Sequence, residues 1–182
     1  MQKRKLATAV ILLFLLSCSF PVNPPDPREP VFEATVGPPV NVTLSGRAVF
    51  GSFVDPSSKQ SGFLLQLVTP GDQGISFTRR SANVPAIGAY PVVEFRESKV
   101  LTDLRENEFF GLYVHGREVD YSSLFYSDSG GITISEISGD FLIGQFDFKA
   151  SGYEIREGGS RSRIVVSISG SFDAKKGEVN LK

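Results

Sequence analysis

A strict period-two alternation of apolar and polar residues is the feature that most constrains this chain. The pattern is clearest near the C-terminus, where Ile164, Val166, Ile168, Gly170 and Phe172 alternate with mostly polar residues. A period of two with one apolar face is typical of a half-buried β-strand. Glycine inside such a strand leaves room for another backbone, and the nearby aromatic residue fills the core. We therefore expect residues 163–173 to form a strand.

The same pattern recurs through the rest of the chain from Val42 onward. Strands are predicted at residues 42–50, 62–68, 74–79, 90–95, 110–115, 132–135 and 142–150. Turn residues separate these runs, and helical periodicity is weak, with residues 98–105 and 121–126 as its best candidates. Many short strands at this spacing predict an all-β domain over residues 42–182, a single antiparallel β-sandwich, with a β-barrel as the alternative.

The N-terminus has the layout of an export signal. Met1–Lys5 is basic, and Leu6–Leu16 is uncharged and too short to span a bilayer, which needs roughly 20 apolar residues. Leu15-Leu16-Ser17-Cys18 resembles the lipobox of bacterial lipoproteins. The resemblance implies cleavage of a signal peptide, residues 1–17, and lipidation of the Cys18 thiol, usually with acylation of the new amino group. The alternative is an ordinary signal peptide with an incidental cysteine.

This resemblance sets the expected location. The protein is expected to be exported and membrane-anchored through the lipid on Cys18, and Ser19 after the cysteine favours the outer membrane if the source is diderm. Cys18 is the single cysteine of the chain. The domain behind it is therefore expected to fold without a disulfide.

A proline-rich segment follows Cys18. Residues 19–40 hold seven of the chain's 11 prolines, which favour an extended spacer because proline lacks a backbone donor. We expect residues 18–41 to be a linker that lifts the domain off the membrane. The alternative is that Val31–Ala34 already pairs as an edge strand.

Charge argues against nucleic acid as a partner. Three of the 19 Lys and Arg residues precede Cys18, which leaves 16 against 20 Asp and Glu, a formal charge of −4. Phosphate binding needs a clustered basic face. The short basic clusters Arg79-Arg80, Arg161–Arg163 and Lys175-Lys176 are interpreted as solvated surface, with anion binding as the alternative.

The C-terminal part, residues 131–182, resembles the ends of many uncharacterised secreted lipoproteins. The matching residues are Gly144–Phe148 and Ser169–Phe172, in an arrangement of an isoleucine-rich strand, a Gly-x-Phe-x-Phe strand and a closing Ser-Gly-x-Phe strand. The resemblance implies a tethered β-sandwich and carries no activity or site residues.

One short motif invites an enzymatic interpretation. Asp128–Gly131 matches the Asp-Ser-Gly-Gly that surrounds the nucleophile of trypsin-like serine proteases, and His115 and Asp120 precede it in that family's order. In that family the triad gathers from two barrels with long separations in sequence, for which this chain is too short. We therefore expect residues 127–131 to be a turn and expect no catalytic residues.

No cofactor or metal site is expected. His115 is the single histidine, so a zinc site lacks companions, and the alternation places it with Tyr113 on the exposed face of its strand, away from Leu112. The acidic residues show no calcium-loop spacing.

Tyrosines offer the best candidate binding surface, because each combines a flat apolar ring with a hydroxyl. The candidates are Tyr113, His115, Tyr121, Tyr126 and Tyr153. The alternative is that the tyrosines lie at the core edge. The sequence thus favours a lipid-anchored, non-enzymatic envelope module that binds an envelope protein or a glycan or has a structural role. A β-barrel carrier of a small apolar ligand is the alternative, and a hydrolase is less favoured.

Overall fold

The computed structural model describes residues 28–56, 58–71, 73–95, 101–116, 124–155 and 160–179. These residues form nine strands and one short 3-10 helix: β1 Val31–Val36, β2 Val42–Val54, β3 Ser61–Val68, β4 Gly74–Arg79, β5 Gly88–Val92, η1 Leu101–Asp103, β6 Phe110–Val114, β7 Leu124–Ser138, β8 Phe141–Ile155 and β9 Arg161–Lys176. The predicted all-β class is confirmed. A strand forms at each predicted run from residue 42 onward, and β7, β8 and β9 extend beyond the predicted runs. The run 90–95 is confirmed only in part, because β5 ends at Val92 and residues 93–95 are not strand.

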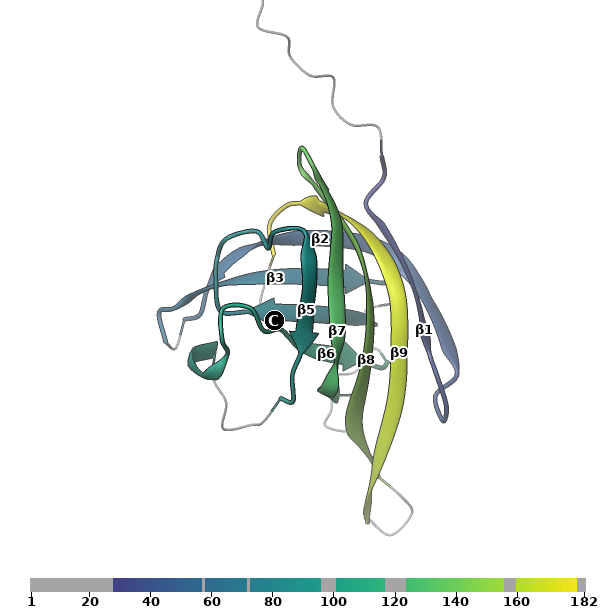
Figure 1. Cartoon of the computed structure of the whole chain (residues 1–182). Coiled ribbons are helices and arrows are strands. Elements are labelled where there is room, and N and C mark those ends of the chain that lie inside the picture. Colours follow the sequence, from purple (N-terminus) through teal and green to yellow (C-terminus); the bar gives the residue numbers. More distant parts are fainter. Residues whose placement is uncertain are drawn as a thin grey trace, which may run out of the picture.

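All the strands belong to one sheet with the order β5-β7-β6-β4-β3-β2-β1-β9-β8. An additional pairing between β7 and β8 joins the last strand of this order to the second. β2, β3 and β6 run across the view of Figure 1, whereas β5, β7, β8 and β9 run up and down in front of them. The antiparallel sheet therefore folds over into two facing halves, as in a sandwich, with the core between them.

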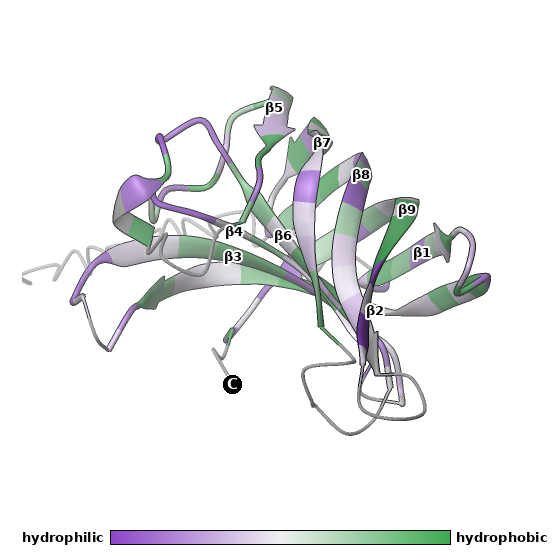
Figure 2. Ribbon diagram, turned by 90° about the horizontal axis from the view of Figure 1, so that it is seen from below, coloured by the Kyte–Doolittle hydropathy of each residue, from purple (hydrophilic) through white to green (hydrophobic). Residues whose placement is uncertain are grey.

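Phenylalanine fills the space between the halves. Phe146 on β8 lies 5.1 Å from Phe77 on β4 and 6.4 Å from Phe172 on β9, between ring centroids. Glycine makes room for these rings, because a Cβ on Gly170 would lie 2.8 Å from Cζ of Phe146 and 2.3 Å from the carbonyl oxygen of Glu33. Figure 2 shows the resulting alternation of hydrophobic and hydrophilic bands along β7 and β8.

The predicted linker is wrong from Val31 onward. Residues 31–36 form β1, which pairs with β2 on one side and β9 on the other, so it is an interior strand and not the edge strand of the alternative. The reason is the alternation of Phe32, Ala34 and Val36, all buried, which outweighs the prolines on either side. The earlier part of the predicted linker and the signal peptide, residues 1–27, lie outside the described residues.

Two further local predictions are corrected. The run 127–131 is not a turn but part of β7, with a register shift between Ser127 and Ser129. Neither weak helix candidate forms as expected. Residues 124–126 begin β7, and the region 98–105 contains the short helix Leu101–Asp103.

Candidate functional site

A hollow of about 750 Å³ lies on the outer face of the sheet, over β1, β2, β7, β8 and β9. Polar and small residues dominate its lining. They are Glu33, Thr35, Thr43, Gly130, Gly131, Thr133, Gln145, Asp147, Ser169 and Ser171, with Ala34, Phe146 and Gly170 beneath. We call this hollow the outer groove. Its volume falls within the range of roughly 300–1,000 Å³ typical of ligand sites.

Strand register brings the groove residues together in two rows. One row runs Thr133, Gln145, Ser171 and Glu33, each opposite the next across β7, β8, β9 and β1. The second row runs Gly131, Asp147, Ser169, Thr35 and Thr43 and continues onto β2. Side chains opposite each other on one face lie roughly 5 Å apart, so each row is a continuous line of polar groups.

The β7 backbone bends beside the groove. Gly130 has a φ of 151°, and a Cβ there would lie 2.3 Å from the carbonyl oxygen of Asp147. The register shift between Ser127 and Ser129 precedes it. A bulge followed by glycine bends a strand locally and lets its neighbour approach closely, so only glycine fits at this position.

Hydrogen-bond acceptors give the groove its chemistry. Glu33 and Asp147 are exposed, and neither forms an ion pair within the part of the chain that the structure describes. Hydroxyls come from Thr35, Ser169 and Ser171, and both carboxylates and hydroxyls accept hydrogen bonds from a ligand. The groove can therefore bind a polar ligand rich in hydrogen-bond donors.

The predicted tyrosine surface does not form a single site. Tyr113 is fully buried, so the prediction that it is partly exposed is wrong. Tyr126 is half-buried on β7, Tyr153 is 51% exposed on β8, and Tyr121 lies outside the described residues. None of the described candidates lines the outer groove.

The burial of Tyr113 reflects a reversed polarity of β6. Phe110 and Leu112 point outward and are half-buried, because Phe95 covers this face and packs against Phe110 at 5.2 Å and Tyr126 at 4.6 Å. Tyr113 points inward against Phe125, at 5.5 Å between ring centroids. A segment that covers the outer face thus reverses the strand orientation that the alternation predicts.

A hydrogen bond joins Tyr113 to His115. The Tyr113 hydroxyl lies 2.7 Å from Nδ1 of the half-buried histidine. Burial raises the pKa of Tyr113 to about 12, so the phenol keeps its proton at neutral pH and can donate it in this hydrogen bond. This geometry gives His115 a structural partner.

The protease-like motif, residues 128–131, and the preceding Ser127 have a structural role. Ser127 is buried, and its hydroxyl accepts from the Gly111 amide at 3.0 Å and donates to the Val93 carbonyl at 2.7 Å. Asp128 accepts from the Ser151 hydroxyl at 2.9 Å and from Arg163 at 3.0 Å. Both side chains therefore hold neighbouring segments onto β7.

The structure does not bring Ser129 and His115 together. Leu124 pairs with Val114, the residue before His115, and Ser129 lies five residues further along β7. At about 3.3 Å per residue this step alone is roughly 16 Å, and His115 lies one residue further away, so the two side chains are beyond hydrogen-bond reach.

Sequence reasoning missed the groove residues. They occupy ordinary outward positions of five strands, and their juxtaposition depends on strand order and register, which were not predicted. The available signal was the run of serines, rather than Lys or Glu, at the outward positions Ser167, Ser169 and Ser171.

The comparisons with protein-family models, with curated proteins and with solved structures find no match to this chain. In the described ranges no group of three or more His, Cys, Asp or Glu side chains could hold a metal ion. The same ranges contain no helix long and apolar enough to cross a membrane.

Proposed function

We propose that this protein is an exported lipoprotein, anchored through Cys18, whose β domain binds a hydroxyl-rich glycan of the cell envelope in the outer groove without transforming it. The observation that carries the proposal is the groove itself, a hollow of about 750 Å³ whose walls are two rows of polar side chains.

The groove chemistry favours sugar hydroxyls as ligand groups. Carboxylates such as Glu33 and Asp147 accept hydrogen bonds from hydroxyls, and Ser, Thr and Gln side chains can donate as well as accept. Each hydrogen bond contributes about 0.5–1.5 kcal/mol net, so several contacts along a chain are needed for useful affinity. The two rows provide such a series of contacts.

The N-terminal attachment is consistent with a tether. Arg28, the first described residue, packs 4.8 Å over the Phe141 ring and lies 3.6 Å from Glu136, both near the β7–β8 turn. Nine residues lie between Cys18 and Arg28, so the two can be at most about 35 Å apart. A lipid on Cys18 would therefore hold the domain near the membrane and raise its effective concentration toward envelope polymers.

The binding proposal is tested by co-sedimentation of the purified domain with isolated peptidoglycan and by titration with soluble envelope polysaccharide. The wild-type chain is expected to bind, and Glu33→Gln combined with Asp147→Asn is expected to weaken binding about thirtyfold. Each substitution replaces a charged hydrogen bond of about 1.5–3 kcal/mol by a neutral one of about 0.5–1.5 kcal/mol, a loss of about 1 kcal/mol per site. Lys149→Gln, two residues from Asp147 but outside the groove, is the matched control. Equal binding by the groove variant and the control would contradict the proposal.

The anchoring proposal needs a separate test. Mass spectrometry of the mature N-terminus in a bacterial host should find a lipid-modified Cys18, and Cys18→Ser should release the protein from the membrane fraction. An unmodified mature chain that begins at another residue would contradict anchoring while leaving the groove proposal intact.

A further inference from the structure

Arg79, at the end of β4, is a buried cation whose hydrogen bonds are incomplete. It points toward the core side with Ile75 and Phe77 and is 8% exposed. Its Nε and Nη1 atoms are buried and have no hydrogen-bond partner among the described residues. No acidic side chain in the described segments forms an ion pair with it. The sequence-based interpretation of this residue as solvated surface is therefore wrong.

Aromatic rings flank the guanidinium but do not replace the missing partners. Its central carbon lies 5.7 Å from the ring centroids of both Tyr90 and Phe109. A desolvated cation–π contact contributes about 2 kcal/mol, whereas removing an ion from water costs several kcal/mol. Arg79 is thus stabilised in part, and an anion that accepts from its unpaired N–H groups would complete its environment.

The segment around Arg79 also exposes apolar side chains. Val84 is 42% and Ile87 is 63% exposed in the connection between β4 and β5. The Tyr90 hydroxyl donates to the Ala86 carbonyl at 2.8 Å, so the ring that flanks Arg79 is bonded to this connection. A buried cation and an exposed apolar stretch therefore lie at the same end of the domain.

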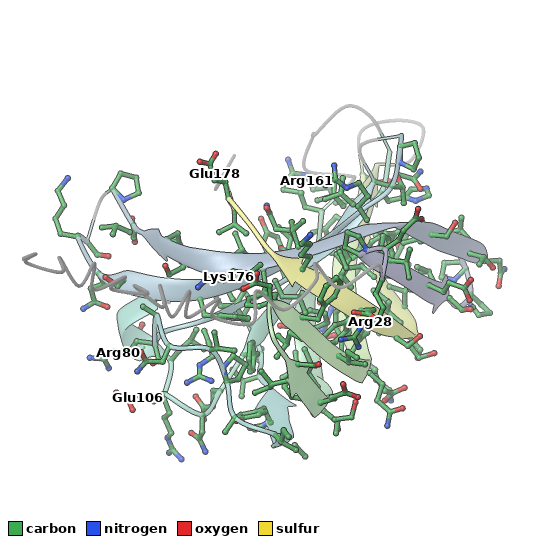
Figure 3. The ribbon with its side chains drawn as sticks, turned by 90° about the horizontal axis from the view of Figure 1, so that it is seen from above. Arg28, Arg80, Glu106, Arg161, Lys176 and Glu178 are labelled. Carbon is green, nitrogen blue, oxygen red and sulfur yellow. The ribbon has the colours of Figure 1, made fainter. Side chains whose placement is uncertain are left out.

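The next residue provides a contrast. Arg80 is exposed and lies on the outside of the fold, on the same side of the molecule as Glu106 in Figure 3. The chain thus places one arginine in solvent and the adjacent one among aromatic rings. This pair supplies a matched control for any test of Arg79.

We propose that Arg79 binds the carboxylate of a small acidic amphiphile, whose apolar part lies against Val84 and Ile87. A carboxylate carries one charge and matches a single guanidinium in planarity and hydrogen-bond geometry. A phosphate group would bring a second charge, for which the described surroundings offer no second buried cation. This site is separate from the outer groove, and the proposal does not depend on the function of the groove.

The experiment uses decanoate as the probe, below its micelle-forming concentration, with decanol and inorganic phosphate as the other arms. The thermal midpoint of the wild-type protein should rise with decanoate and stay constant with decanol or phosphate. Arg79→Met should remove the decanoate response and raise the midpoint without ligand, because it replaces an unpaired buried charge with an apolar side chain. Arg80→Gln, and the groove variant Glu33→Gln with Asp147→Asn, should respond as wild type does.

A second readout does not depend on the stability of any variant. In ¹⁵N-labelled wild-type protein, the Nε–H resonance of Arg79 should shift on addition of decanoate and not of decanol. An unshifted resonance, or an Arg79→Met protein that keeps the decanoate response, would overturn the proposal. A response to phosphate equal to that to decanoate would overturn the carboxylate assignment.

Discussion

Strands β9 and β6 use the same alternating pattern in opposite ways. In β9 the apolar residues Ile168 and Phe172 face the core, and Ser169 and Ser171 face the outer groove. In β6 the tyrosine Tyr113 faces the core, and the apolar residues face outward beneath Phe95. The difference shows that alternation establishes a strand, whereas the segments that pack against it decide which face is buried.

The contrast extends to the neighbours of each strand. Around β9 the buried residues of β8 and β9 within the described ranges are apolar residues and glycine, among them Phe146, Ile168 and Phe172. Around β6 and β4 the interior includes Arg79, Tyr113 and Ser127. The first region is suited to stability and leaves its outer face for binding. The second carries polar groups inside, where an unpaired group changes both stability and ligand affinity.

The largest expected loss of stability comes from disturbing the close packing of β9. Gly170→Val should destabilise the protein by about 4 kcal/mol or more, because its Cβ would meet the Glu33 carbonyl oxygen at 2.3 Å and the Phe146 ring at 2.8 Å. Urea unfolding measures the change. Gly177→Ala, with no atom within 4 Å of the added Cβ, is the control and should change stability by less than about 0.5 kcal/mol. Equal stability of the two variants would contradict the close packing of β9 against β1 and β8.

A smaller effect is expected on the β6 side. Tyr113→Phe should cost about 1 kcal/mol at neutral pH, because it removes the hydrogen bond to His115. Since the pKa of Tyr113 rises from 10.0 to about 12 on folding, the unfolded chain loses its proton first. The tyrosine's contribution to stability is therefore fully present below pH 10 and declines as the pH rises toward 12.

Urea midpoints measured from pH 8 to pH 12 test this dependence, with the protein held at constant ionic strength. The wild-type curve should fall more steeply above pH 10 than the Tyr113→Phe curve. Parallel curves would show that Tyr113 ionises with an unperturbed pKa and is not buried as described.

The smallest effect on stability is expected in the outer groove. Ser169→Ala and Thr35→Ala should each change the free energy of unfolding by less than about 0.5 kcal/mol, since both side chains are exposed. Their effect should appear in glycan affinity instead. A groove variant that destabilises the protein by 2 kcal/mol or more would show that these residues hold the fold together.

Sequence reasoning predicted the strands because alternation is a local property. The pattern Ile164, Val166, Ile168 identified β9, and the Gly-x-Phe-x-Phe run identified β8. The start of the domain was misplaced because the seven prolines of residues 19–40 favour an extended spacer, whereas Phe32, Ala34 and Val36 alternate as in a strand. Proline composition describes a segment on average, whereas pairing with β2 and β9 depends on a few alternate positions.

The candidate sites were less predictable because they depend on distant neighbours. Tyr113 was expected at the surface from the local pattern of β6, and only the covering Phe95 explains its burial. No local sequence pattern distinguishes Arg79 from Arg80, and only the fold shows that the first is buried and the second exposed. The groove depends on the register of five strands, and the alternation of apolar and polar residues does not predict that register.

Hydrogen–deuterium exchange of the full chain, with and without soluble envelope polysaccharide, tests most directly whether the outer groove is the binding face. Slower exchange is expected in residues 33–35, 145–147 and 169–171 on glycan addition, and unchanged exchange is expected around Tyr113 and Arg79. Slower exchange confined to β4 and β6, or no change anywhere at saturating polysaccharide, would contradict binding in the outer groove.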